Sequence, residues 1–150
     1  MAESLPQYDV AIVGGGLAGL AASIELARQG FRVVLLEKKR YPFHRVCGEY
    51  ISEDSRPFLE RLGVPVSRLE LPSIRKLQVS APDGELLQTS LDSGGFGISR
   101  YMLDNLLAIQ ARAEGVDLRE GVKVQDIFPA SDSSRIIANE LSLEARLVIG

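Results

Sequence analysis

Apolar positions near the start of the chain follow the order strand, helix, strand. Residues 10–13 form an apolar run without polar alternation, which is typical of a parallel strand buried on both faces. Between residues 17 and 27 apolar side chains recur at helical spacing, and Gly30 suits the left-handed end of a helix. Residues 31–36 are again nearly all apolar and are followed by Glu37. The pattern predicts one β-α-β unit over residues 8–37.

The chain after Glu37 is expected to hold shorter elements. Residues 38–52 show no regular period, so we interpret them as a loop that leaves the carboxyl end of the sheet. The expected elements are a short helix over residues 52–62, strands over 74–80, 85–91 and 96–98, a helix over 100–114, and strands over 116–118, 121–128, 135–138 and 141–149. The first three strands would form an inserted antiparallel meander with turns at 81–84 and 92–95, and the last strands a small β unit. The fold class is therefore α/β, with a Rossmann-type parallel sheet.

Three glycines follow the first strand at the spacing G-x-G-x-x-G. Gly14 allows a tight turn, Gly16 lets the backbone approach a pyrophosphate, and Gly19 lets the helix lie against the strand. The free N–H groups at the start of the helix, around Leu17 and Ala18, would receive the phosphates. The motif predicts that this unit binds a dinucleotide.

Glu37 ends the second strand, where an acid can accept both hydroxyls of an adenosine ribose. The alternative is a glycine-rich turn in an ordinary β-α-β unit, with Glu37 merely exposed. Strand, helix, second strand and terminal acid together favour the dinucleotide site. Lys38 belongs to the basic cluster of residues 38–40, which we interpret mainly as a solvated loop beside that site.

Composition narrows the classes of function. A chain of 150 residues is about one domain long, and its net charge of -3 argues against nucleic acid as a partner. No apolar run approaches the length of a membrane-spanning helix. His44 is the single histidine, so we expect neither a metal centre nor a Ser-His-Asp arrangement. The single Cys47 and the absence of a signal-peptide pattern in MAESLPQ favour the cytoplasm.

The spacing of the later elements favours FAD over NAD. A plain NAD-binding fold would continue soon after Glu37 with another helix and parallel strand, whereas here roughly 60 residues intervene.

Residues 145–150 look like a buried strand arriving at a turn, and a complete protein would seldom stop there. We therefore expect a fragment of a larger protein.

Three segments carry a resemblance to a known family. They are the glycine unit ending at Glu37, the loop PFHRVCGEYIS over residues 42–52, and the helix that begins Arg100-Tyr101-Met102-Leu103-Asp104. Through them nearly the whole chain resembles the N-terminal part of the FAD-dependent oxidoreductases with the p-hydroxybenzoate hydroxylase fold, most closely the geranylgeranyl reductase-like flavoproteins. The resemblance implies an FAD-binding domain over residues 1–150, with the last part of the fold missing and a substrate domain expected after residue 150.

The resemblance also implies roles for single residues. Arg100 would approach the ribityl and phosphate groups of FAD, and the backbone of Val124 would lie against the adenine. Cys47, Gly48 and Glu49 would lie near the isoalloxazine, where the Cys47 thiol is a candidate proton donor and Glu49 a candidate acid. Free Cys is commonly a small buried side chain, which is the alternative interpretation of Cys47, and Glu49 could equally be a helix cap or a partner of Arg45. Arg45 itself would contact the phosphates or ribose of FAD, or form a surface salt bridge. Asp104 would pair with Arg100 along the helix.

Three classes of function remain open. The first is a flavin reductase or dehydrogenase acting on an apolar substrate, isoprenoid or polyketide-like, as the Cys47–Glu49 segment suggests. The second is a flavin monooxygenase or halogenase, whose loops carry a similar Gly-Glu pair. The third is a non-enzymatic nucleotide-binding module. NAD(P)H or another reductant would supply electrons, because one Rossmann unit holds one dinucleotide.

Overall fold

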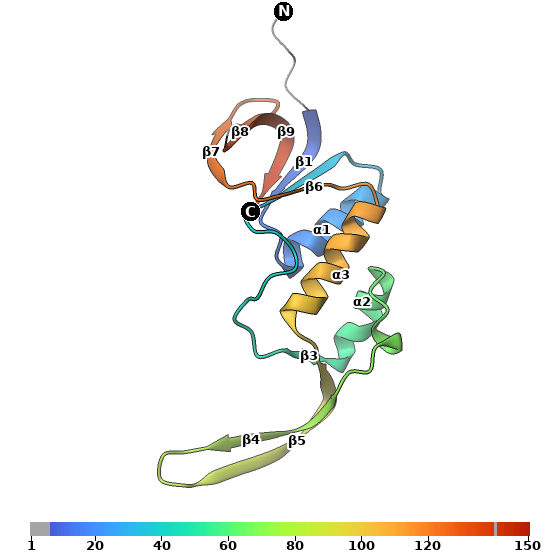
Figure 1. Cartoon of the computed structure of the whole chain (residues 1–150), viewed down its shortest axis with the longest axis vertical. Helices are drawn as coiled ribbons and strands as arrows, with labels where there is room; N and C mark the ends of the chain where they lie inside the picture. Colours follow the sequence, from blue (N-terminus) through green and yellow to red (C-terminus); the bar gives the residue numbers. More distant parts are fainter. Residues whose placement is uncertain (1–6, 140) are drawn as a thin grey trace, which may run out of the picture.

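The computed structural model describes residues 7–139 and 141–150, which adopt an α/β fold with a mixed sheet and a separate antiparallel sheet (Figure 1). This confirms the expected fold class. The helices are α1 (Leu17–Arg28), α2 (Arg56–Arg61) and α3 (Arg100–Ala113), with 3₁₀ turns at Glu53–Ser55 and Val66–Arg68. The strands are β1 (Gln7–Val13), β2 (Val33–Glu37), β3 (Tyr50–Ser52), β4 (Ser73–Ser80), β5 (Leu86–Gly97), β6 (Asp117–Glu120), β7 (Val124–Pro129), β8 (Ser134–Ala138) and β9 (Leu141–Ile149). Residues 1–6, on which the absence of a signal-peptide pattern partly rests, lie outside the described residues.

The larger sheet has the strand order β6-β2-β1-β9-β8-β7. β1 pairs in parallel with β2 and β9, and β2 pairs in parallel with β6. Alternate side chains of β1 and β2 enter two different cores. Val10 and Val33 face α1 and α3, whereas Ala11 and Val34 pack against β8 and β9, which curl over the opposite face. The unbroken apolar runs in these two strands follow from this burial on both faces.

The smaller sheet has the order β3-β5-β4, and its β4–β5 ribbon projects away from the body of the molecule (Figure 1). Two predictions for this region are wrong. Residues 50–52 form a strand and not part of a loop, and residues 92–95 continue β5 and do not form a turn. Gly95 explains both results, because a Cβ there would lie 2.4 Å from the Ile51 carbonyl oxygen. The glycine lets β3 approach β5 closely.

The β4–β5 ribbon has one apolar and one polar face. Val79 pairs with Leu87 and Leu77 pairs with Thr89, so their side chains share one face. Gln78 and the residue opposite it lie on the other face. Leu77, Val79 and Leu87 are all exposed. Within the described ranges, the apolar face of the ribbon is therefore uncovered.

The helix expected over residues 52–62 is shorter than predicted. Ser52 accepts a hydrogen bond from the Asp54 amide as expected of a cap, but it caps the 3₁₀ turn, and α2 starts only at Arg56. Pro57 explains the offset, because proline favours the first turn of an α-helix, where its missing N–H costs nothing.

The last strands form the expected small β unit, which is continuous with the main sheet. β8 and β9 pair antiparallel, and β9 lies beside β1, so both extend the main sheet. The expected burial of residues 145–149 is only partly observed, because Ala145 is buried while Leu147 and Ile149 are exposed. Leu147 lies opposite Val10 on the helix side of the sheet, and the described helices do not extend over β9.

No helix of the described residues is long and apolar enough to span a membrane. Within the same residues, no group of three or more His, Cys, Asp or Glu side chains is arranged to hold a metal ion.

Candidate functional site

The glycine turn joins β1 to α1 in the way that the motif predicts. Gly14 has a φ of 111°, and its amide donates to the Leu36 carbonyl at 2.9 Å. A Cβ on Gly19 would lie 2.1 Å from the Gly14 carbonyl oxygen, so the helix needs a glycine there. In contrast, no described atom lies within 4 Å of a Cβ built on Gly16. Gly16 thus borders open space at the start of α1.

The start of α1 is suited to an anion. Gly16 is its N-cap residue, and in the described part of the chain no side chain caps the helix and no acid occupies its first turn. The N–H groups of the first turn, including those of Leu17 and Ala18, have no partners within an α-helix. They can therefore donate to a negatively charged group in the open space beside Gly16.

Glu37 is buried, with 4% of its surface exposed. One carboxylate oxygen accepts from the Gly15 amide at 2.8 Å and from Nη2 of Arg45 at 3.0 Å, and the other accepts from the Lys39 amide at 2.9 Å. The alternative that Glu37 is merely an exposed residue is therefore wrong. Its contact with Gly15 fixes the acid beside the glycine turn.

A cavity of about 370 Å³ opens between the glycine turn and the start of β7. It lies at the carboxyl ends of β1 and β2, where α/β sheets bind their ligands. It is lined by Val13, Gly14, Gly16, Leu36, Glu37, Lys38, Arg45, Val122, Lys123 and Val124. The sequence analysis missed Val122 and Lys123. The sequence carries no local signal for them, because their place depends on a long-range contact: the Val122 amide donates to the Glu37 carbonyl at 3.0 Å and ties this segment to the end of β2.

The side chain of Arg45 extends from the loop and lines the cavity. It forms partly buried ion pairs and not a surface salt bridge. Its Nε donates to Asp104 at 3.1 Å, and its Nη2 donates to Glu37. Asp104 also accepts from Nε and Nη2 of Arg100 at 2.7 and 2.9 Å, which confirms the expected pair along α3. These hydrogen bonds raise the pKa of Arg100.

Cys47, Gly48 and Glu49 lie outside the cavity, together with Arg100. Cys47 is exposed, so the interpretation as a small buried side chain is wrong. The thiol lies beside the Arg100 guanidinium, and after the dominant Asp104 hydrogen bond it also contributes to the raised pKa of Arg100. Glu49 has a φ of 57°, and its carbonyl accepts from the Ile98 amide at 2.9 Å. The side chain of Glu49 is exposed; Ser52, and not Glu49, caps the turn that follows.

Two aromatic residues that the sequence analysis did not single out hold the loop against the glycine turn. The Tyr41 hydroxyl donates to the Gly15 carbonyl. The Tyr41 and Phe43 rings are 5.3 Å apart, and the Arg45 guanidinium lies 4.4 Å from the Phe43 ring centroid. Burial, and then the neighbouring carboxylates Glu37 and Asp104, raise the pKa of Tyr41. Tyr41 is therefore a neutral hydrogen-bond donor at physiological pH.

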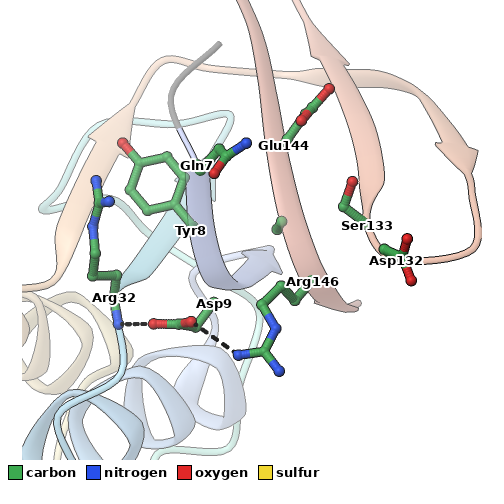
Figure 2. Close-up of a pocket in the computed structure, with 9 residues that line it drawn as sticks. Gln7, Tyr8, Asp9, Arg32, Asp132, Ser133, Glu144 and Arg146 are labelled. Carbon is green, nitrogen blue, oxygen red and sulfur yellow. Dashed lines mark hydrogen bonds and ion pairs between the residues drawn. The ribbon is translucent and has the colours of Figure 1, made fainter. Parts of the chain in front are cut away.

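A second hollow, of about 310 Å³, lies at the amino-terminal end of β1 (Figure 2). There Asp9 accepts from the Arg32 amide at 2.8 Å and from Arg146 at 3.4 Å. This hollow is at the end of the sheet opposite to the glycine turn. We therefore assign the functional site to the cavity at the turn.

The chain is similar to known flavoproteins. Residues 7–144 match a family model described as an FAD binding domain. A flavin-dependent halogenase of Armillaria mellea is 33% identical over 141 residues, which cover 88% of this chain and 27% of that protein. A digeranylgeranylglycerophospholipid reductase of Sulfolobus acidocaldarius is 28% identical over 118 residues, covering 75% of this chain and 25% of that protein. The chain spans about a quarter of the length of these relatives.

Solved structures share the fold. A p-nitrophenol 4-monooxygenase from Pseudomonas putida superimposes with a TM-score of 0.81 at 21% identity, covering 96% of this chain and 40% of that one. A myxobacterial chondrochloren halogenase, described as FAD-dependent, gives a TM-score of 0.77 at 23% identity, covering 95% and 36%. Identities this low show a common fold alone.

Proposed function

Because this chain belongs to the FAD-binding domain family, we propose that it is the FAD-holding part of a flavin-dependent monooxygenase or halogenase. The observation that carries the proposal is the cavity in which Gly16 and Glu37 face the same space. The similarity to a flavin-dependent halogenase favours the oxygen-using group over the reductases.

The residues around the cavity fit the adenosine and diphosphate of FAD. The open space at Gly16 can hold a phosphate against the N–H groups of α1, to which Leu17, Ala18 and the closely packed Gly19 belong. Glu37, held beside the glycine turn, can accept the two hydroxyls of the ribose. Val124 and Lys38 border the same space and would contact the adenine side of the cofactor.

Arg45 and Arg100 would supply positive charge along the phosphates and ribityl chain, because each is held by Asp104. Cys47, Gly48 and Glu49 would continue toward the flavin ring. When bound, FAD supplies the redox chemistry, taking electrons from NAD(P)H or another reductant. The substrate is proposed to be a small apolar molecule bound mainly by the rest of the same protein, in the cytoplasm.

Titration of the purified 150-residue chain with FAD, followed by flavin fluorescence, tests the proposal. We expect saturable binding of FAD and competition by ADP, with NAD⁺ binding much more weakly. Binding of NAD⁺ in preference to FAD, or binding of neither, would refute the assignment. In the full-length protein, reduced flavin should consume oxygen in the presence of substrate.

A reductase is the second candidate, and the exposed Cys47 thiol beside Arg100 is the observation that favours it. A thiol near a reduced flavin could deliver a proton as hydride leaves for an apolar alkene. The similarity to an archaeal reductase agrees with this candidate.

The variant Cys47→Ser separates the two candidates in the full-length protein. If the thiol delivers a proton, the variant should keep FAD. In the absence of oxygen, substrate should reoxidise the reduced flavin of the variant more slowly than that of the parent protein. If it has no such role, that rate should stay within about twofold, a barrier change near 0.4 kcal/mol. Stopped-flow reoxidation at matched flavin content gives the answer.

A further inference from the structure

One buried carboxylate connects the two arginines of the proposed FAD site. Asp104 has 1% of its side chain exposed. Its Oδ1 accepts from Nε of Arg100 at 2.7 Å, and its Oδ2 accepts from Nη2 of Arg100 at 2.9 Å and from Nε of Arg45 at 3.1 Å. Arg100 comes from α3 and Arg45 from the loop after β2. Asp104 is thus the point at which the loop is fixed to the helix.

The far end of Arg45 occupies a position that the cofactor would need. Its Nη2 donates to Oε2 of Glu37 at 3.0 Å and to the Gly15 carbonyl at 3.3 Å. A carboxylate offers about four acceptor positions, and backbone amides already use two of those on Glu37. A ribose with two hydroxyls would therefore have to take over the contact between Glu37 and Arg45.

We propose that Asp104 is a positioning residue, which holds Arg45 and Arg100 in place when FAD displaces Arg45 from Glu37. The inference rests on the proposed function. Nε of Arg45 stays bound to Asp104 while Nη2 is released, so the guanidinium turns from the acid toward the diphosphate and does not leave the site. Asp104 itself touches no part of the cofactor.

The charges of the network distinguish this proposal from simple electrostatic attraction by the direction of the expected change in FAD affinity. Glu37 and Asp104 carry two negative charges, and Arg45 and Arg100 carry two positive charges. Loss of the Asp104 charge would make the site more positive, so simple attraction to the phosphates predicts tighter FAD binding. Positioning predicts the opposite, because Arg45 would keep Glu37 as its one acidic partner and would compete with the ribose.

The test is FAD titration of the 150-residue chain carrying Asp104→Asn. We expect binding to weaken by about tenfold or more, the loss typical of a disturbed charge-assisted contact. Asp117→Asn is the matched control, since Asp117 also pairs with an arginine but lies on β6 outside the cavity. The control should bind FAD as the parent chain does. Unchanged or tighter binding in Asp104→Asn would overturn the proposal.

A double-mutant cycle with Arg45→Met distinguishes positioning from general loss of structure. If Asp104 acts through Arg45, Asp104→Asn should have a much smaller effect on FAD affinity when Arg45 is already replaced. Equal effects in the two backgrounds would contradict the proposal.

Asp104→Glu answers the question if the Asn variant does not fold. It keeps the paired charge but moves the carboxylate by one methylene, so FAD binding should weaken, and this weakening should be smaller beside Arg45→Met. Weakening of equal size with and without Arg45→Met would overturn the proposal. A parent chain that binds no FAD would refute the proposed function instead, so the two failures are distinguishable.

Discussion

The hydroxyl of Tyr41 stands where a side chain on Gly15 would have to be. A Cβ built on Gly15 lies 1.9 Å from the Tyr41 oxygen and 3.1 Å from its Cζ. The loop after β2 and the glycine turn are therefore fitted to each other at this point. The absence of a side chain at Gly15 has a reason in packing that the G-x-G-x-x-G motif alone does not include.

Gly15→Ala should destabilise the chain by about 1–3 kcal/mol, the range for inserting an atom into a packed region. Tyr41→Phe should cost about 0.5–1.5 kcal/mol through the lost hydrogen bond. In the double variant the nearest atom of the ring is more distant, so the two losses should not add. Urea unfolding of the four proteins checks this, and strict additivity would contradict the packing relationship.

Glu37→Gln should weaken FAD binding by about 1.5–3 kcal/mol, because the ribose loses a charged acceptor. The substitution keeps the size of the side chain, and titration calorimetry with FAD measures its effect. Glu144→Gln is the control, because Glu144 pairs with Arg135 away from the cavity. Equal FAD affinity in both variants would remove Glu37 from the site.

Gly16→Val and Gly19→Val should fail in different ways. Gly16 borders open space, so its variant should fold with a normal circular dichroism spectrum and lose FAD. Gly19 lies against the Gly14 carbonyl and the Ile12 side chain, so its variant should unfold at lower temperature whether or not FAD is added. A Gly16→Val chain with undiminished FAD affinity would place the phosphates elsewhere.

Asp117 should make stability depend on pH in the acidic range. Burial alone would raise its pKa, but hydrogen bonds from Arg119 and Tyr8 outweigh burial and hold the pKa below the ordinary value of 3.8. A lowered carboxyl pKa stabilises the fold above that ordinary value, and this stabilisation is lost as the pH falls through the lowered pKa.

Asp117→Asn should therefore be less stable than the parent chain near neutral pH, by about 1 kcal/mol or less because the pair is partly exposed. The difference should shrink as the pH falls from 3.8 through the lowered pKa of Asp117. Melting temperatures of both proteins across the acidic range measure it. A difference that persists undiminished in acid would show that the Asp117 charge is not its source.

The first β-α-β unit was predictable because its signals are local. Unbroken apolar runs, three glycines and Glu37 each act within a few positions of the chain. β3 and the full length of β5 were missed for the opposite reason. Glycine is common in turns, and the packing role of Gly95 becomes clear only when the distant Ile51 is placed beside it.

The candidate site was predictable in its residues but not in its connections. Glu37 and Arg45 were expected separately, and so was the pair of Asp104 with Arg100. The contact of Arg45 with Asp104 joins residues 59 positions apart. No periodicity or motif encodes such a contact, because it depends on how the loop packs across α3.

The β4–β5 ribbon affects the behaviour of the isolated chain in solution. A two-stranded ribbon is marginally stable in water, and this one presents Leu77, Val79 and Leu87 to the solvent. Apolar strands exposed in this way tend to pair with one another. We therefore expect self-association through the ribbon to limit the concentration at which the isolated chain stays in solution. This limit should be reached before the parallel sheet unfolds.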